Sequence, residues 1–100
     1  MTPEVTKIKQ DLDNYGYQDG NLHVYFILYY TSNIIKIGHG RHLYDRLYRL
    51  YNDSPIDLKL IGCTQKFTEK EVHKKFKHLH IRNEFYIASP ELYKFINDNL

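Results

Sequence analysis

The sequence predicts a small α+β domain in which helices flank a three-stranded, mainly antiparallel sheet. Of its 100 residues, 42% are hydrophobic and 15% aromatic, so the chain can fill one core and is too apolar to be disordered. Short runs of β-branched and aromatic residues alternate with segments of helical spacing, and turn residues separate them. We expect one domain, with residues 1–20 as an N-terminal helical extension and residues 22–97 as the core.

The N-terminal half is expected to form a helix, a hairpin and a second helix. Residues 2–4 have the order of N-cap, proline and acid that starts a helix. Strands over residues 22–30 and 34–37 would form the hairpin, ended by glycines, before a helix over residues 42–51. The apolar residues at helical spacing are Val5, Ile8, Leu12 and Tyr15 in the first helix, and Leu43, Leu47 and Leu50 in the second.

The C-terminal half continues the alternation. A third strand is expected over residues 57–63 and a helix over residues 68–80, with Val72, Phe76 and Leu79 facing inward. Glu84–Ala88 fits a short strand or an extended segment. The last helix opens at Ser89 with a cap, a proline and an acid, and Leu92, Tyr93 and Ile96 form its buried side.

Charge and cysteine content restrict the class of protein. The net charge is only +2, so nucleic-acid binding would need a local basic patch. Cys63 is the single cysteine, which excludes an intrachain disulfide, and its apolar surroundings predict burial. The N-terminus lacks a signal-peptide pattern, and the longest apolar run is too short to span a bilayer. We therefore expect a soluble, non-secreted protein, cytoplasmic or inside a host cell if viral, with no membrane partner.

Arg46 falls at the margin of the apolar face of the second helix, beside Leu43 and Leu50, whereas Arg49 and Asp45 point elsewhere on the helical wheel. An arginine held near the sheet suits a phosphate, because its fork of donors matches the oxygens. The wheel alone favours the plainer interpretation, in which the stem of the arginine lies along the core and its head group stays in water.

Glu69, His73 and His80 share one edge of the helix over residues 68–80, next to Val72 and Phe76. A carboxylate there is costly unless it is paired or binds a cation. Glu69 and His73 are four residues apart and could share a hydrated divalent ion. The alternative is an ordinary helix pair that contributes only about 0.2–0.5 kcal/mol.

The basic residues around this helix fit either a solvated surface or contact with a phosphate backbone. We expect four of them to contact DNA: Lys66, Lys70, Lys74 and Lys77. We expect Arg41, which precedes the second helix, to contact DNA as well.

Two short motifs, Val24-Tyr25-Phe26 and Lys36-Ile37-Gly38, lie on the two strands of the expected hairpin. Lys36 follows Tyr25 by eleven positions and precedes Arg46 by ten. These motifs and intervals resemble the GIY-YIG nuclease superfamily, in its viral and bacterial branch with Lys-Ile-Gly as second motif. The segments 69–76 and 83–86 are also similar to that family, so the resemblance covers about residues 22–97.

The resemblance implies a role for individual residues. Tyr25 matches the tyrosine that activates the attacking water, Arg46 the arginine that stabilises phosphate charge, and Glu69 the single metal-binding carboxylate. Lys36 stands where many members have a second tyrosine, and His39 is a candidate for proton transfer. His73 is a further catalytic candidate through its pairing with Glu69. A cation near Tyr25 could lower its pKa from the usual value of about 10.

The resemblance therefore implies an endonuclease that hydrolyses DNA with Mg²⁺ or Mn²⁺ as cofactor. Leu50 stands where many members have a histidine or tyrosine, and the asparagine near the end of the family pattern has Glu84 or Tyr86 as its nearest counterpart. These departures favour the alternative, a weak or inactive module of the same fold that binds nucleic acid or a protein. An assembly protein with tyrosines at an interface ranks last, and either a monomer or a homodimer is compatible with the sequence.

Overall fold

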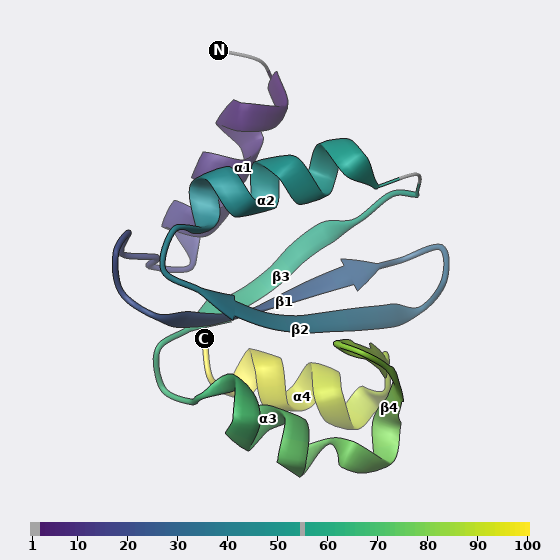
Figure 1. The fold of residues 1–100 in the computed structure, drawn as a ribbon. Coiled ribbons are helices and arrows are strands. Elements are labelled where there is room, and N and C mark those ends of the chain that lie inside the picture. The colour runs from purple at the N-terminus through teal and green to yellow at the C-terminus, as the bar shows by residue number, and fades with distance from the viewer. Residues whose placement is uncertain (1–2, 55) are drawn as a thin grey trace.

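In the part of the chain that the structure describes, four α-helices cover the two faces of a five-stranded antiparallel sheet (Figure 1). The computed structural model describes residues 3–54 and 56–100, with side chains from residue 7 onward. The predicted α+β class is confirmed, but the sheet has two strands more than predicted. The elements are α1 Pro3–Asn14, β1 His23–Tyr29, β2 Ile34–Gly40, α2 Leu43–Asp53, β3 Lys59–Thr64, α3 Glu69–Lys75, the 3₁₀ turn η1 Lys77–Leu79, β4 His80–Arg82, β5 Phe85–Ile87 and α4 Pro90–Asp98.

The strands follow the order β3-β1-β2-β5-β4, so β1 lies between its hairpin partner β2 and the edge strand β3. The expected hairpin is present, and its register places Tyr25 opposite Gly38. β2 continues to Gly40, beyond the predicted end at Ile37. β5 pairs with β2 only from Ile34 to Lys36. The last residues of β2 therefore form an edge that no strand of the described chain covers.

The helix predicted over residues 68–80 is shorter in the structure. α3 ends at Lys75, and a 3₁₀ turn then leads into β4, which the sequence analysis did not anticipate. The spacing from Phe76 to Leu79 fits a 3₁₀ turn as well as an α-helix, so periodicity alone could not locate the end. Asn83, with a left-handed φ of 51°, permits the tight turn from β4 to β5.

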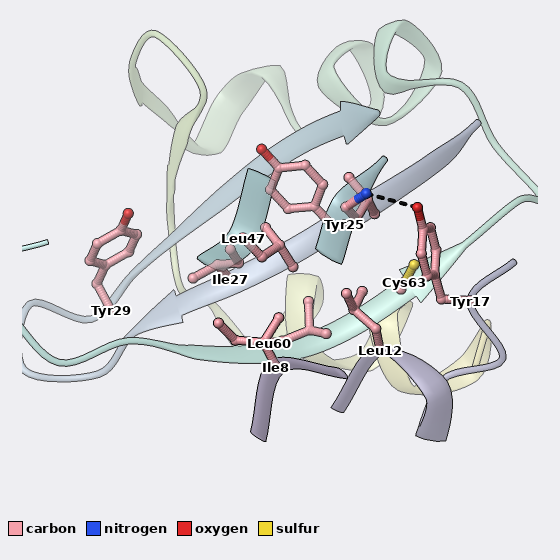
Figure 2. Packing of buried hydrophobic residues seen from close by; sticks show 10 residues of the cluster. Ile8, Leu12, Tyr17, Tyr25, Ile27, Tyr29, Leu47, Leu60 and Cys63 are labelled. Atoms are coloured by element: carbon pink, nitrogen blue, oxygen red, sulfur yellow. Dashed lines mark hydrogen bonds between the residues drawn. The ribbon is translucent and has the colours of Figure 1, made fainter. Parts of the chain in front are cut away.

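The two faces of the sheet carry separate halves of the core. β1 alternates between them, because successive side chains of a strand point to opposite faces. Figure 2 shows one half, in which Ile8 and Leu12 of α1 and Leu47 of α2 pack with Ile27 and Leu60 of the sheet. The other half, under α3 and α4, comprises Val24, Phe26, Ile35, Ile37, Val72, Phe76, Tyr86, Ala88, Leu92 and Ile96.

Most side chains expected to face inward do so. Ile8, Leu12, Leu43, Leu47, Val72, Phe76, Leu92 and Ile96 are buried, and Tyr15, Leu50, Leu79 and Tyr93 are half-buried. Cys63 is buried as predicted. Thr2 and the side chain of Val5, which also belonged to the predicted first helix, lie outside the described part of the chain. None of the described helices has both the length and the hydrophobicity needed to cross a membrane.

The N-terminus of α2 is capped by a residue far away in the sequence. His42, at the N-cap, makes no side-chain capping bond. The backbone N–H of Leu43 instead donates to the hydroxyl of Tyr17 over 2.7 Å, shown as the dashed line in Figure 2. The same hydroxyl lies 2.7 Å from the Arg41 carbonyl and 2.7 Å from an oxygen of Asp19, either of which can accept its proton. Tyr17 thereby fixes α2 to the loop that precedes β1.

Replacing Tyr17 with phenylalanine should test this cap. The buried N–H of Leu43 would lose its acceptor, which should lower the free energy of unfolding by about 1–3 kcal/mol. Urea denaturation followed by circular dichroism measures the change, with Tyr30→Phe, at a tyrosine 52% exposed, as the matched control. Equal stability of the two variants would show that the Tyr17 hydroxyl does not hold the helix.

Candidate functional site

The uncovered edge of β2 is where side chains from both faces of the sheet meet. Successive residues of β2 point to opposite faces of the sheet. The face that carries α2 has Lys36, Gly38 and Gly40, and the face that carries α3 has Ile37 and His39. β5 ends beside Lys36, and its preceding turn is joined to β2 by one bond of 2.9 Å, from the N–H of Ile37 to the carbonyl of Glu84. Groups above and below the sheet can therefore approach each other around Gly38.

Tyr25 reaches this edge because Gly38 has no side chain. A Cβ added at Gly38 would lie 2.5 Å from both Cζ and the hydroxyl oxygen of Tyr25, far inside van der Waals contact. The ring thus packs directly on the backbone of the neighbouring strand. Tyr25 itself is only 1% exposed.

Arg46 is held over the same edge from α2. Its Nη1 donates a hydrogen bond of 2.9 Å to the carbonyl of His39. A Cβ at Gly40 would lie 2.8 Å from Leu43 and 3.3 Å from Nη1 of Arg46, so this second glycine lets α2 come close. The guanidinium is therefore positioned by the sheet, in the place at the helix margin that the wheel indicated.

Glu69 approaches from the opposite face, at the first residue of α3. Its side chain is 18% exposed, with His39 Nδ1 at 3.4 Å and His73 Nε2 at 3.9 Å from its oxygens. The His39 contact is with Oε2 and the His73 contact with Oε1, but neither is a hydrogen bond. Oε2 is buried and has no hydrogen-bond partner among the described residues. His73 Nε2 instead bonds the carbonyl of Ile37 over 3.0 Å. His80, expected on the same helix edge, lies on β4 and bonds the carbonyl of Asn83, because α3 ends earlier.

A second carboxylate, that of Glu84, lies at the turn before β5. Its Oε2 is 3.8 Å from Nζ of Lys36 and likewise has no hydrogen-bond partner among the described residues. Lys36 also lies over the ring of Phe85, at 5.8 Å from the centroid. Lys36 is therefore restrained on two sides, and its ammonium group stays close to the site.

The pKa of Tyr25 is raised, whereas a nearby cation was expected to lower it. Burial of the ring raises the pKa to about 12; Arg46 lowers it, as expected of a cation, while Glu84 and Glu69 raise it further. The expectation of a lowered pKa is wrong for the free protein, because the loss of water around the hydroxyl outweighs the effect of Arg46. Tyr25 is a neutral phenol at neutral pH.

Beside these residues lies a hollow of about 400 Å³ between β2 and α2. Asp45 and Arg49 line it, although the helical wheel placed them away from the sheet. The wheel describes only one helix and cannot show that the side of α2 faces the end of β2. The full set of lining residues is Tyr25, Lys36, Asp45, Arg46, Arg49 and Leu50.

The basic residues expected to contact DNA are all exposed, but they do not line the hollow. Lys70 and Lys74 project from the side of α3 opposite the buried Val72 and Phe76. Nη1 of Arg41 donates a long bond of 3.4 Å to the carbonyl of Gly20. The last two of the set, Lys66 and Lys77, lie just before and just after α3.

The carboxylate of Glu69 is a group that suits a magnesium ion. No group of three or more histidine, cysteine, aspartate or glutamate residues in the described part of the chain is arranged to hold a metal ion. Mg²⁺ keeps several waters and takes one or two carboxylates together with substrate phosphate. The oxygen of Glu69 that forms no hydrogen bond belongs to a carboxylate, the kind of group that Mg²⁺ takes.

The structure therefore brings together Tyr25, Lys36, His39, Arg46, Glu69 and His73, all of which the sequence indicated. Glu84 and Arg49 join them. Comparisons of the chain with models of protein families, with curated proteins and with solved structures found no match. The functional interpretation thus depends on the geometry of the site.

Gly38→Ala should test the close approach of Tyr25. The added Cβ would push the ring out of its place, which should cost about 1–3 kcal/mol of stability through overpacking. Chemical denaturation of Gly38→Ala, alone and combined with Tyr25→Leu, measures the coupling between the two positions. Because leucine lacks the clashing atoms, the alanine should cost clearly less in that background; an unchanged cost would place the clash elsewhere.

The raised pKa of Tyr25 predicts a loss of stability at alkaline pH. The unfolded chain releases this proton near pH 10, whereas the folded protein holds it until about pH 12. The stabilisation is thus complete below pH 10 and lost as the pH rises toward 12, with a limiting slope of about 1.4 kcal/mol per pH unit. Tyr25→Phe should reduce the slope, measured by thermal unfolding at a series of pH values. Tyr30→Phe should match the wild type, and an unchanged slope in Tyr25→Phe would contradict the burial of this hydroxyl.

Proposed function

We propose that the protein is a divalent-metal-dependent endonuclease that hydrolyses phosphodiester bonds in DNA, in line with its resemblance to the GIY-YIG superfamily. The observation that carries the proposal is the buried oxygen of Glu69 that accepts no hydrogen bond from the described residues, at the same strand edge as Arg46 and Tyr25. A binding module has no need of a buried carboxylate beside two groups suited to a phosphate, because that carboxylate repels the ligand.

Arg46 is proposed to bind the phosphate that is cut. Its hydrogen bond to the carbonyl of His39 holds the guanidinium in place before substrate arrives, and only one of its five N–H donors is needed for that bond. The other donors can match the phosphate oxygens. A cation fixed in advance stabilises the charge that grows in the transition state without having to reorganise.

Tyr25 is proposed to orient the attacking water. As a neutral phenol, it can donate a hydrogen bond to the phosphate or accept one from the water. The side chain of His39 lies beside Glu69 and is 50% exposed. His39 is proposed to accept the proton that the attacking water loses and then to release it to solvent. Lys36 lines the same hollow as Tyr25 and adds a second positive charge there.

Glu69 would hold the divalent ion, Mg²⁺ or Mn²⁺, through its free oxygen. The ion would supply charge relief on the phosphate and at the leaving oxygen. His73 is proposed to position Glu69, because its ring is fixed to the carbonyl of Ile37 and lies 3.9 Å from the carboxylate. One such site cuts one strand of the DNA. Double-strand cleavage would therefore need a homodimer or two encounters.

We propose that the DNA substrate is cut inside a cell.

Cleavage of supercoiled plasmid, with Mg²⁺ or Mn²⁺ and with a chelator, tests the proposal. The wild type should relax the plasmid only with a metal ion. Arg46→Ala and Glu69→Gln should each reduce the rate by about 100-fold or more, as removal of a transition-state contact commonly does. Circular dichroism and thermal unfolding should show that both variants keep the fold.

Matched controls are available on the same chain. Glu91→Gln changes an exposed glutamate of α4, and Arg82→Ala changes an exposed arginine of β4, so both should cut like the wild type. Relaxation that persists in Arg46→Ala and Glu69→Gln would eliminate this site as its source. A wild type that binds DNA but leaves the plasmid intact with either metal ion would favour the non-catalytic module.

A further inference from the structure

The hollow between β2 and α2 concentrates positive charge in a chain that is nearly neutral overall. Three of its lining residues are cations, and one is a carboxylate, whereas the whole chain has a net charge of only +2. Arg46 and Arg49 are three residues apart on α2, so their side chains lie on adjacent turns, with about 5–6 Å between the Cβ atoms. Both arginines line the same hollow.

The two arginines are held differently. Arg46 is fixed to the sheet by its bond to His39. Within the described part of the chain, Arg49 is paired only with Asp45, at 3.2 Å. The side chains of both are largely exposed, at 74% and 68%. Exposed pairs of this kind are weak and easily exchanged for another anion. Arg49 is therefore free to bind an incoming phosphate, while Arg46 already has a fixed place at the candidate catalytic edge.

The size and walls of the hollow indicate more than one phosphate. About 400 Å³ is more than a single phosphate fills, and the hollow extends along α2 beyond Arg46. Leu50 supplies an apolar wall, against which the carbon face of a sugar can pack. All its cationic groups suit backbone oxygens, which are bound in the same way whatever the base sequence.

We infer that this hollow is the subsite for the phosphate and sugar next to the phosphodiester that is cut, with Arg49 as its phosphate-binding residue. The inference rests on the proposed function and deepens it. The substrate is then a strand with at least two consecutive phosphodiesters, held without regard to sequence, and a simple phosphate ester leaves the subsite empty. Leu50 has a role here as a sugar contact.

Binding of a fluorescein-labelled DNA oligonucleotide, followed by anisotropy in the presence of a chelator over a series of salt concentrations, tests the subsite without cleavage. Arg49→Ala should weaken binding roughly tenfold, the usual effect of losing one charged hydrogen bond. It should also reduce the slope of log affinity against log salt by about 1, which a purely structural change would not do. Arg82→Ala is the matched control and should change neither quantity.

Three further measurements identify the ligand group. Asp45→Asn removes the competing carboxylate and should tighten binding, opposite in sign to Arg49→Ala. In cleavage, Arg49→Ala should raise KM and leave kcat within about twofold, because its contact is the same in the ground and transition states. In the binding assay, an oligonucleotide in which every second linkage is a neutral methylphosphonate cannot place charged phosphates at both positions, and it should lose clearly less affinity with Arg49→Ala.

An Arg49→Ala protein that folds normally but binds with unchanged affinity and salt slope would overturn the subsite. Failure of the wild type to bind the oligonucleotide would overturn it as well. If the wild type binds with the predicted Arg49 dependence but cuts no plasmid, the hollow is a DNA-binding site and the proposed catalysis is wrong. The binding and cleavage assays therefore separate the two proposals.

Discussion

The contact between Tyr25 and the backbone of Gly38 is the constraint on which the candidate site depends. The two residues are opposite each other in the β1–β2 register, and only a residue without a Cβ leaves room for the ring. A shift of one residue in this pairing would send every side chain of β2 to the other face and bring a side chain under the ring. The register of the hairpin therefore determines where the hydroxyl of Tyr25 lies.

The position of α2, which carries Arg46 and Arg49, also depends on a glycine of β2 and on contacts distant in sequence. Gly40 lets α2 approach β2, and Tyr17 caps the first turn of that helix from the loop before β1. Ile8 and Leu12 of α1 are buried in the half of the core that supports α2, at 2% and 0% exposure. The segment that we expected to be an N-terminal extension thus takes part in positioning Arg46, and the chain around the site is held by contacts distant in sequence.

Features set by local periodicity could be predicted, and features set by contacts between elements could not. The hairpin and the inward faces of the helices follow from spacings of two and of three to four residues, and so do the positions of Arg46 and Glu69. The end of α3 and the strand β4 depend on how Phe76 is buried and how Asn83 turns the chain, which periodicity does not record. The hollow exists only when β2, α2 and β5 are packed together, and so does the place of Arg49 in its wall. The raised pKa of Tyr25 depends on the same packing.

The charges around the edge of β2 are incompletely balanced in the protein alone. Glu69 and Glu84 each bury an oxygen that accepts no hydrogen bond from any described residue. Leaving such an oxygen without a hydrogen bond costs stability that other parts of the fold must offset. On the other side of the edge, Arg46 and Arg49 keep donors free. Carboxylate oxygens without hydrogen bonds beside guanidinium groups with free donors are a poor arrangement for stability, because moving them together would satisfy both. The proposal of a metal ion at Glu69 and consecutive phosphates at the arginines accounts for this separation, since each ligand supplies the charge that one side lacks.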